Sequence, residues 1–393
     1  MSISILSKLF KDEMSTVASI GAASQVINKL ECGDPALSWC LGSWTLNRPN
    51  LIYGQSGSGK SALASIGAGK AQKKRPGSLV IFNDTEFYYH EQPERIKRLE
   101  KYGVDIDNTM IISGNTLDDA FGKLSQIENL LKEEKIDVAS WVIDSWQGIE
   151  NLSAAKKLDE NKNGEGASDA GNAHRGNAKS MNPILTRILS LCAKYKITLF
   201  IVQHVMVSQD QYGPKFLMLG GEKLRHLCDS ILYVESVQAV DSKLNADGEI
   251  AGKDDTVVGK KIRGRGEKTR NTVEGKKVEF WMDFESCSFA KAEDSLLSLA
   301  ENLDVIYTPF EIETDANGKP IIDKKTGQPK KKEERGYYEV NLENGVFKVY
   351  GRSRMLEKLK DPSVFAQVQK ACMLSNSTNA SKGSLKEVTD AAD

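Results

Sequence analysis

Short apolar runs alternate with longer stretches of helical character through the middle of the chain. From Pro49 onward, runs of strand length lie at residues 50–54, 78–84, 109–113, 139–145, 197–204 and 229–236. Segments with helical spacing lie between them at 60–73, 92–102, 116–134 and 180–195. Continuous apolar strands that alternate with helices are typical of a mostly parallel sheet covered on both faces. We therefore expect an α/β core over residues 49–290.

Two stretches within this core lack a regular pattern. Residues 151–178 are rich in Gly, Asn, Asp and Ala, and residues 205–221 read VMVSQDQYGPKFLMLGG. Structureless segments longer than about 12–15 residues in a compact domain are usually functional or disordered. Both segments directly follow predicted strands, where α/β proteins place their binding loops. We therefore expect both to be functional loops.

The two ends of the chain have different patterns from the core. Residues 1–48 begin with a helical pattern over 4–20 and become irregular around 32–35. Residues 291–374 predict a small α/β domain with a helix at 295–303, a polar hairpin-like insert, a pair of strands and a helix near 361–373. Residues 375–393 cannot bury a core, and we expect them to be disordered.

Composition narrows the functional classes only slightly. The 53 basic and 54 acidic residues give a formal net charge of −1, so any nucleic-acid binding must depend on local basic patches. The six cysteines form no CxxC pair, which argues against a zinc ribbon or a disulfide framework and fits a reducing cytoplasm. No apolar run approaches the roughly 18 residues needed to span a bilayer. Charged residues as early as Lys8 and Lys11 argue against a secretory signal.

The clearest chemical motif is the segment GQSGSGKS, which fits the phosphate-loop pattern G-x-x-x-x-G-K-[ST] in full. It follows a predicted strand and precedes a predicted helix, the context in which such glycines turn backbone N–H groups around phosphates. Lys60 would reach the β- and γ-phosphates of ATP, and Ser61 would ligate Mg²⁺. The expected nucleotide-binding residues are Gly54, Gln55, Ser56, Gly57, Ser58, Gly59, Lys60, Ser61 and Ala62.

Two carboxylates that follow predicted strands are candidates for the rest of this site. Asp144 ends the apolar run ASWVID, where a carboxylate beside a phosphate loop would orient the metal. A strand-end Asp can also simply cap a turn. Glu86 follows the strand SLVIFND and could activate the attacking water, although a capping or surface role is equally compatible with its spacing.

The order of these motifs resembles the RecA-type recombinases, most closely the phage UvsX-like group. The matching segments are GQSGSGKS, NDTEF, GVDIDN, WVIDS, FIVQH and LGGEKLRHLCDSILYV, followed by GEKTRNTV and GVFKVYGRSRMLEKLKDP. The resemblance covers roughly residues 35–373. It implies a RecA-like ATPase core with a mostly parallel central sheet.

The resemblance also implies catalytic roles for individual residues. Glu86 would be the catalytic base, and His204 would sense the γ-phosphate and signal to the second loop. Lys268 and Arg270 would reach the ATP of a neighbouring subunit and stabilise charge there, as an arginine finger does. The residue that stacks on adenine is not fixed by the sequence; Arg95, Tyr88 and Tyr89 are the candidates.

The two irregular stretches correspond to the two DNA-binding loops of this family. Basic groups interleaved with aromatic ones suit sequence-tolerant binding of single strands. Without the resemblance, solvated loops with incidental charges would be the alternative. The runs at 260–265 and 330–332 could widen the footprint or be solvated faces. The candidate DNA-binding residues are Arg175, Lys179, Tyr212, Phe216, Gly220, Gly221 and Arg225.

The function implied by the resemblance is ATP-dependent homologous pairing and strand exchange. Subunits would form a helical filament on single-stranded DNA, with residues 1–48 packing on the next core, and would pair that strand with homologous double-stranded DNA. Single-strand-binding and loader proteins are further expected partners. The expected location is the bacterial cytoplasm, in a phage-infected cell.

Other proteins share parts of this pattern. A hexameric helicase with the same core would carry an N-terminal domain larger than residues 1–48 and would lack the C-terminal domain. A non-catalytic mediator paralogue commonly loses the phosphate-loop Lys or the catalytic Glu, whereas Lys60 and Glu86 are present here. A repair ATPase of the RadA type would bring a zinc finger, which the cysteine spacing excludes.

Overall fold

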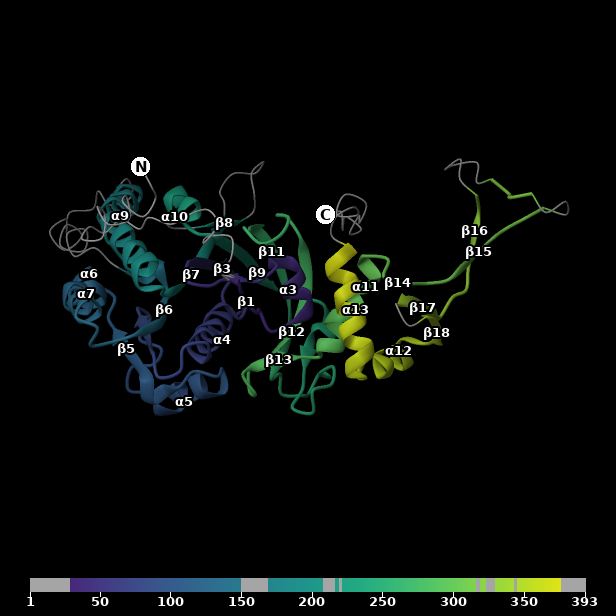
Figure 1. Ribbon diagram of the computed structural model, residues 1–393, viewed down its shortest axis with the longest axis horizontal. Coiled ribbons are helices and arrows are strands. Elements are labelled where there is room, and N and C mark those ends of the chain that lie inside the picture. Colours follow the sequence, from purple (N-terminus) through teal and green to yellow (C-terminus); the bar gives the residue numbers. More distant parts are fainter. Residues whose placement is uncertain are drawn as a thin grey trace, which may run out of the picture.

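The computed structural model describes residues 29–149, 169–207, 216–218, 221–315, 319–322, 329–342 and 345–375. It is an α/β structure built on one large mixed sheet (Figure 1). Helices α5 (Pro93–Lys101), α6 (Leu117–Phe121) and α7 (Leu124–Lys132) lie towards one end of the molecule, and a smaller C-terminal unit lies at the other end (Figure 1). No helix in the described ranges is long and apolar enough to cross a membrane.

The centre of the sheet is parallel, as the apolar runs predicted. Its strands are arranged in the order β9-β3-β7-β6-β4-β5, and all neighbours in this series pair in parallel. They are β3 (Pro49–Gly54), β4 (Leu79–Asp84), β5 (Thr109–Ser113), β6 (Val138–Asp144), β7 (Thr198–Val207) and β9 (Ser230–Ser236).

Helices cover both faces of these strands. On β3, Ile52 packs in a cluster with Leu63 of α4, whereas the adjacent Leu51 packs in a second cluster with Leu191 of α9. Successive strand residues point to opposite faces, so these strands must be apolar throughout. The predicted helix at 116–134 is two helices, α6 and α7, separated at Gly122, and glycine is a poor helix former. The helices are α4 (Lys60–Lys73), α5 (Pro93–Lys101), α6 (Leu117–Phe121), α7 (Leu124–Lys132), α9 (Asp169–Tyr195) and α10 (Gly221–Leu227).

Antiparallel strands that the sequence did not reveal extend the sheet beyond β9. Residues Gly259–Lys268 form β11, Lys277–Asp283 form β12, and Ser288–Ala290 form β13. The short β10 (Lys243–Leu244) pairs with β11. The basic run at 260–265 is therefore a strand of the main sheet.

Residues 29–48 pack on this antiparallel part of their own chain. The region around 32–35, expected to be irregular, instead starts helix α3 (Pro35–Leu41), because Asp34 accepts hydrogen bonds from the N–H groups of Ala36 and Leu37 at 2.8 and 3.0 Å. Strands β1 (Lys29–Leu30) and β2 (Trp44–Thr45) flank this helix. Residues 1–28 lie outside the described residues.

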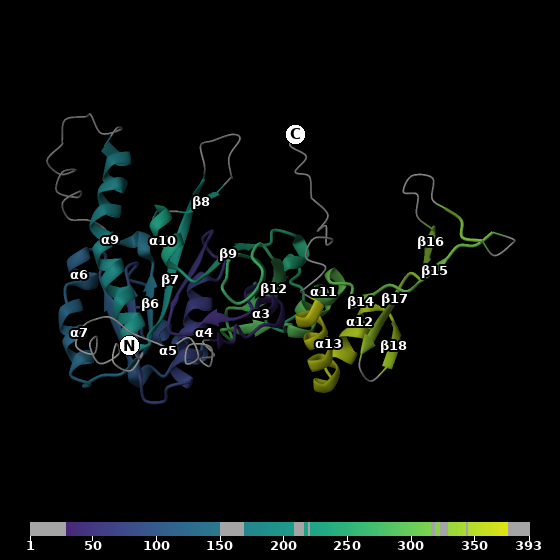
Figure 2. The same cartoon turned by 45° about the horizontal axis from the view of Figure 1, so that its top comes forward.

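Regular structure also occupies parts of both expected loops. The prediction of an irregular segment to residue 178 is wrong for its end, because α9 begins at Asp169. In the second segment, β7 continues to Val207 and pairs antiparallel with β8 (Phe216–Met218), while α10 begins at Gly221. Helix α9 and the β7–β8 hairpin extend beyond the sheet on the same side (Figure 2). Residues 150–168, 208–215 and 219–220 lie outside the described residues.

The C-terminal region combines helices with short strands. Leu296, Val340, Met355 and Val368 share one apolar cluster with α3 and β12 of the main body. A ribbon of β15 and β16 projects away from this unit (Figure 1). The elements are α11 (Ala292–Asn302), β14 (Ile306–Tyr307), β15 (Phe310–Ile312), β16 (Lys331–Glu333), β17 (Tyr337–Leu342), β18 (Gly345–Tyr350), α12 (Arg352–Leu359) and α13 (Pro362–Leu374). Residues 376–393, within the expected tail, are not described.

Candidate functional site

The loop between β3 and α4 has the backbone geometry of an anion cradle. Gly54, Gly57 and Gly59 all have positive φ angles of 156°, 69° and 81°. A Cβ atom on Gly54 would lie 1.8 Å from the carbonyl oxygen of Val234, so only glycine fits there. The loop leads directly into the N-terminus of α4, whose free N–H groups favour negative charge.

Lys60 is the first residue of α4, directly after this loop. Its ammonium donates a hydrogen bond to the carbonyl oxygen of Gln55 at 2.6 Å, and only 5 % of the residue is exposed. Burial lowers the pKa of Lys60, while the nearby carboxylates of Asp144 and Glu86 act in the opposite direction. A phosphate group that entered the cradle would give this ammonium a better partner than a neutral carbonyl.

Asp144 stands at the carboxyl end of β6, next to the loop. Desolvation raises the pKa of its carboxyl group to about 6, and a hydrogen bond with the Ser61 side chain opposes that shift. A hydroxyl and a carboxylate side by side fit Mg²⁺, which binds through one or two carboxylates together with phosphates and water. No group of three or more His, Cys, Asp or Glu side chains in the described part of the chain could hold a metal by itself.

Glu86 and His204 form a pair close enough to Lys60 for the Glu86 carboxylate to raise the pKa of Lys60. The His204 Nε2 and Glu86 Oε1 atoms are 2.9 Å apart, and the Ser145 hydroxyl donates to the same oxygen at 3.0 Å. The hydrogen bond from His204 is the main reason that the pKa of Glu86 is lowered. Glu86 is therefore an ionised acceptor at neutral pH, held by one donor just after β6 and one in β7.

The backbone around this pair is fixed by short contacts between β4 and β6. The Ser145 N–H donates to the Thr85 hydroxyl at 2.8 Å, and that hydroxyl donates to the Ser145 carbonyl at 2.8 Å. The carboxylate of Asp84 accepts the N–H groups of Tyr88 and Tyr89 at 2.9 and 2.7 Å. Glu86 thus projects from a tightly bonded turn. Glu86 follows β4 and Asp144 ends β6, so the pairing of these two strands brings both carboxylates to the site.

An aromatic side chain near the loop was not found from the sequence. A Cβ atom on Gly59 would lie 3.5 Å from the ring of Phe284, in the turn after β12. Of the earlier candidates for base stacking, Tyr89 is only 5 % exposed, whereas Tyr88 is 39 % exposed and carries the Arg95 guanidinium 4.5 Å from its ring centre. No motif marks Phe284. The only hint in the sequence is that Phe284 is an aromatic residue within an otherwise polar turn.

Lys268 and Arg270 are not brought to this loop within one chain. The Lys268 ammonium donates to the carbonyl oxygens of Arg225 and His226, and Arg270 pairs with Asp229. Lys268 lies opposite Ile231 on β9, while Gly54 lies opposite Val234, three residues further along. Three residues correspond to about 10 Å along a strand.

The candidate DNA-binding residues are only partly described. Arg175 and Lys179 lie in the backbone of α9, but their side chains are not described, and Tyr212 and Gly220 fall outside the described residues. Gly221 is the first residue of α10, and Phe216 begins β8. Arg225 forms an ion pair with Glu267 at 2.9 Å.

The basic run at 260–265 is largely neutralised by acidic neighbours. Arg263 pairs with Glu235 of β9 and Glu279 of β12 at 3.2 and 2.9 Å. Arg265 pairs with Glu267. These contacts favour the solvated-face interpretation of this run over the DNA-binding one.

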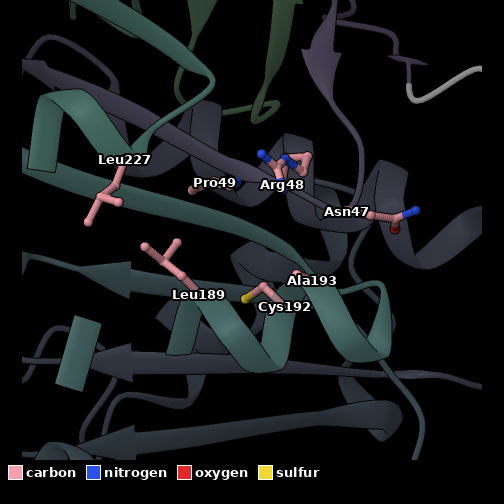
Figure 3. Close-up of a pocket in the computed structure, with 7 residues that line it drawn as sticks. All are labelled: Asn47, Arg48, Pro49, Leu189, Cys192, Ala193 and Leu227. Carbon is pink, nitrogen blue, oxygen red and sulfur yellow. The ribbon is translucent and has the colours of Figure 1, made fainter. Parts of the chain in front are cut away.

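A small cavity lies at the opposite end of the sheet from the phosphate loop. It has a volume of about 170 Å³ and opens where β3 begins, between the ends of α9 and α10 (Figure 3). Its lining is mostly apolar and consists of Asn47, Arg48, Pro49, Leu189, Cys192, Ala193 and Leu227. It contains none of the residues expected to bind nucleotide.

No protein-family model matches the chain.

Proposed function

We propose that this protein is a RecA-type, DNA-dependent ATPase that forms filaments on single-stranded DNA and catalyses homologous pairing and strand exchange. The observation that carries the proposal is the convergence of the phosphate loop, Asp144 and the Glu86–His204 pair at the carboxyl ends of β3, β6, β4 and β7. Ligands of open α/β sheets bind at this edge of the strands.

The chemistry assigned to the site is ATP hydrolysis. The glycine cradle and Lys60 bind and orient the triphosphate, and Ser61 and Asp144 hold Mg²⁺, which neutralises charge on the phosphates when bound. Glu86 accepts the proton of the attacking water, for which its lowered pKa keeps it ready at neutral pH. His204 shares the Glu86 carboxylate and lies opposite Gly54 in the β3–β7 ladder.

His204 also links this site to the segment proposed to bind DNA. It lies in β7 only three residues before Val207, and β7 continues directly into the hairpin with β8. On that hairpin, Met206 and Leu217 face each other across the strands and are 46 % and 40 % exposed. Apolar side chains in this position can pack against unstacked bases, and Arg225 lies just beyond the hairpin.

The proposed filament would explain why Lys268 and Arg270 lie apart from the phosphate loop of their own chain. Lys268 and Arg270 lie on the far side of β9 from the phosphate loop and engage α10 and Asp229 in their own chain. If they act on ATP, they act on the ATP of another subunit. A head-to-tail contact of this kind closes into a ring or continues as a helix. The proposed recombinase activity requires the second arrangement, an open helical filament of subunits.

Electron microscopy with single-stranded DNA and a non-hydrolysable ATP analogue tests the proposal. Helical filaments that form only with both ligands support it. Closed six-membered rings would instead favour a helicase. Lys60→Ala serves as the control. Because it should not bind the ATP analogue, the analogue should not promote its assembly into filaments. A wild-type protein that neither assembles on DNA nor hydrolyses ATP would exclude both functions.

We also propose that the protein works in the bacterial cytoplasm during phage infection.

A further inference from the structure

The end of β11 is fastened to α10 by several charged contacts. The Lys268 ammonium donates to the carbonyl oxygens of Arg225 and His226 at 3.1 and 2.9 Å, in the last turn of α10. Glu267 pairs with Arg225 at 2.9 Å. The last carbonyls of a helix lack partners within it, so a cation there is stabilising. These contacts join the helix that follows the β7–β8 hairpin to the strand that carries Lys268.

A β-bulge makes this arrangement possible. The pairing of β11 with β9 shifts between Gly266 and Lys268, so Glu267 is an extra residue in its strand. Consecutive strand residues normally face opposite sides of a sheet, whereas a bulge redirects them. Here Glu267 and Lys268 both face α10. A regular strand would direct only one of them there.

Asp229 makes the corresponding contact to Arg270. Its carboxylate, whose side chain is only 4 % exposed, accepts from Arg48 at 2.6 Å and from Arg270 at 3.0 Å. Asp229 follows α10 by two residues and precedes β9. A helix cap alone would need only Lys268. Two ion pairs add to this cap. Glu267, next to Lys268, pairs with Arg225 of α10, and Asp229, just after α10, pairs with Arg270.

We infer that Glu267 and Asp229 are positioning residues that couple α10 to Lys268 and Arg270. A shift of α10, caused by DNA at the hairpin before it, then changes the place of both cations together. This inference rests on the proposed function, in which these cations act on the ATP of the next subunit. DNA bound by one subunit would in this way set the turnover of its neighbour.

The test separates coupling from binding. Glu267→Gln and Asp229→Asn are compared with wild type for ATP turnover with and without single-stranded DNA, for the KM for ATP, and for DNA affinity by fluorescence anisotropy. Glu279→Gln is the matched control, since it also removes an ion pair to β11 but lies away from α10. Thermal melting identifies variants that fold.

Stimulation by DNA should fall by about 5- to 150-fold in both variants, the range typical of coupling between two sites. The KM for ATP should remain within about twofold of wild type, because neither residue contacts the phosphate loop. DNA affinity should not fall, because Glu267→Gln removes an acidic partner of Arg225 and no basic group. Folded variants that keep the stimulation of Glu279→Gln would overturn the inference, and so would a loss of DNA affinity that accounts for the effect. If wild type itself shows no DNA-stimulated turnover, the proposed function fails, and the inference fails with it.

Discussion

Replacing Glu86 with Gln is the most direct test of the proposed chemistry. The amide has nearly the same shape as the carboxylate and can still accept the Ser145 hydroxyl, which lies 3.0 Å from Oε1. What disappears is the negative charge and the ability to take a proton. Loss of a general base typically slows turnover by about 10²–10⁴-fold. At about 1.36 kcal/mol for each factor of ten, that is about 2.7–5.4 kcal/mol in the barrier.

The fold and the binding of ATP should survive this change. The Glu86 side chain is 50 % exposed and that of His204 is 29 % exposed, so the contact between them contributes little to stability, about 0–1 kcal/mol. Removing one carboxylate beside Lys60 also reduces repulsion of the incoming phosphates. We therefore expect ATP affinity equal to or higher than that of wild type.

The assay is steady-state ATP hydrolysis with saturating single-stranded DNA, together with nucleotide binding at equilibrium. Glu128→Gln provides the control, because its carboxylate pairs with Arg187 at 2.9 Å between α7 and α9. Since His204 lowers the pKa of Glu86, wild-type turnover should lose this base only when the pH falls below the ordinary glutamate value of 4.5. A Glu86→Gln protein that binds ATP and turns it over at the wild-type rate would show that Glu86 is not the base.

Three further outcomes are expected. Lys60→Ala should abolish both ATP hydrolysis and strand exchange, because no cation would then balance the phosphate charge within the loop; measurable turnover by a radiolabelled phosphate-release assay would contradict this. Lys268→Ala/Arg270→Ala should bind ATP but lose DNA-stimulated turnover, and mixing it with Lys60→Ala should restore some activity. A mixture that co-assembles on DNA yet stays inactive would rule out catalysis between subunits. DNA affinity should fall with salt at a logarithmic slope of about −0.7 for each neutralised phosphate on single strands, and Arg175→Ala/Lys179→Ala should make that slope shallower in a titration by anisotropy. An unchanged slope would remove these two residues from the DNA site.

The parallel core could be predicted because its signals are local. Each buried strand is a continuous apolar run, and the spacing of Gly54, Gly59 and Lys60 has a defined meaning between a strand and a helix. Those features depend on residues close together in the chain. The strand positions and the α/β class were confirmed on this basis.

The antiparallel extension could not be recognised in this way. Arg263 and Arg265 give the run at 260–265 no apolar pattern from which a strand could be predicted, although it forms part of β11 in the main sheet. Their partners Glu235, Glu279 and Glu267 come mainly from other strands, so the charge balance exists only after folding. The helix at Pro35 was missed for a related reason, since it depends on packing against β12 as well as on its Asp34 cap.

The sequence by itself predicted the glycine-rich loop between a strand and a helix, and it showed which carboxylates follow strands. Only the tertiary structure decided that the Glu86 carboxylate bonds to His204, 118 positions away, and that Phe284 lies beside Gly59. It also showed that Lys268 contacts α10 and that Arg270 contacts Asp229, so neither lies near the phosphate loop of its own chain. Spacing along a chain fixes neighbours within one turn or strand. Contacts between elements are set by strand order and by how the sheet buries its two faces.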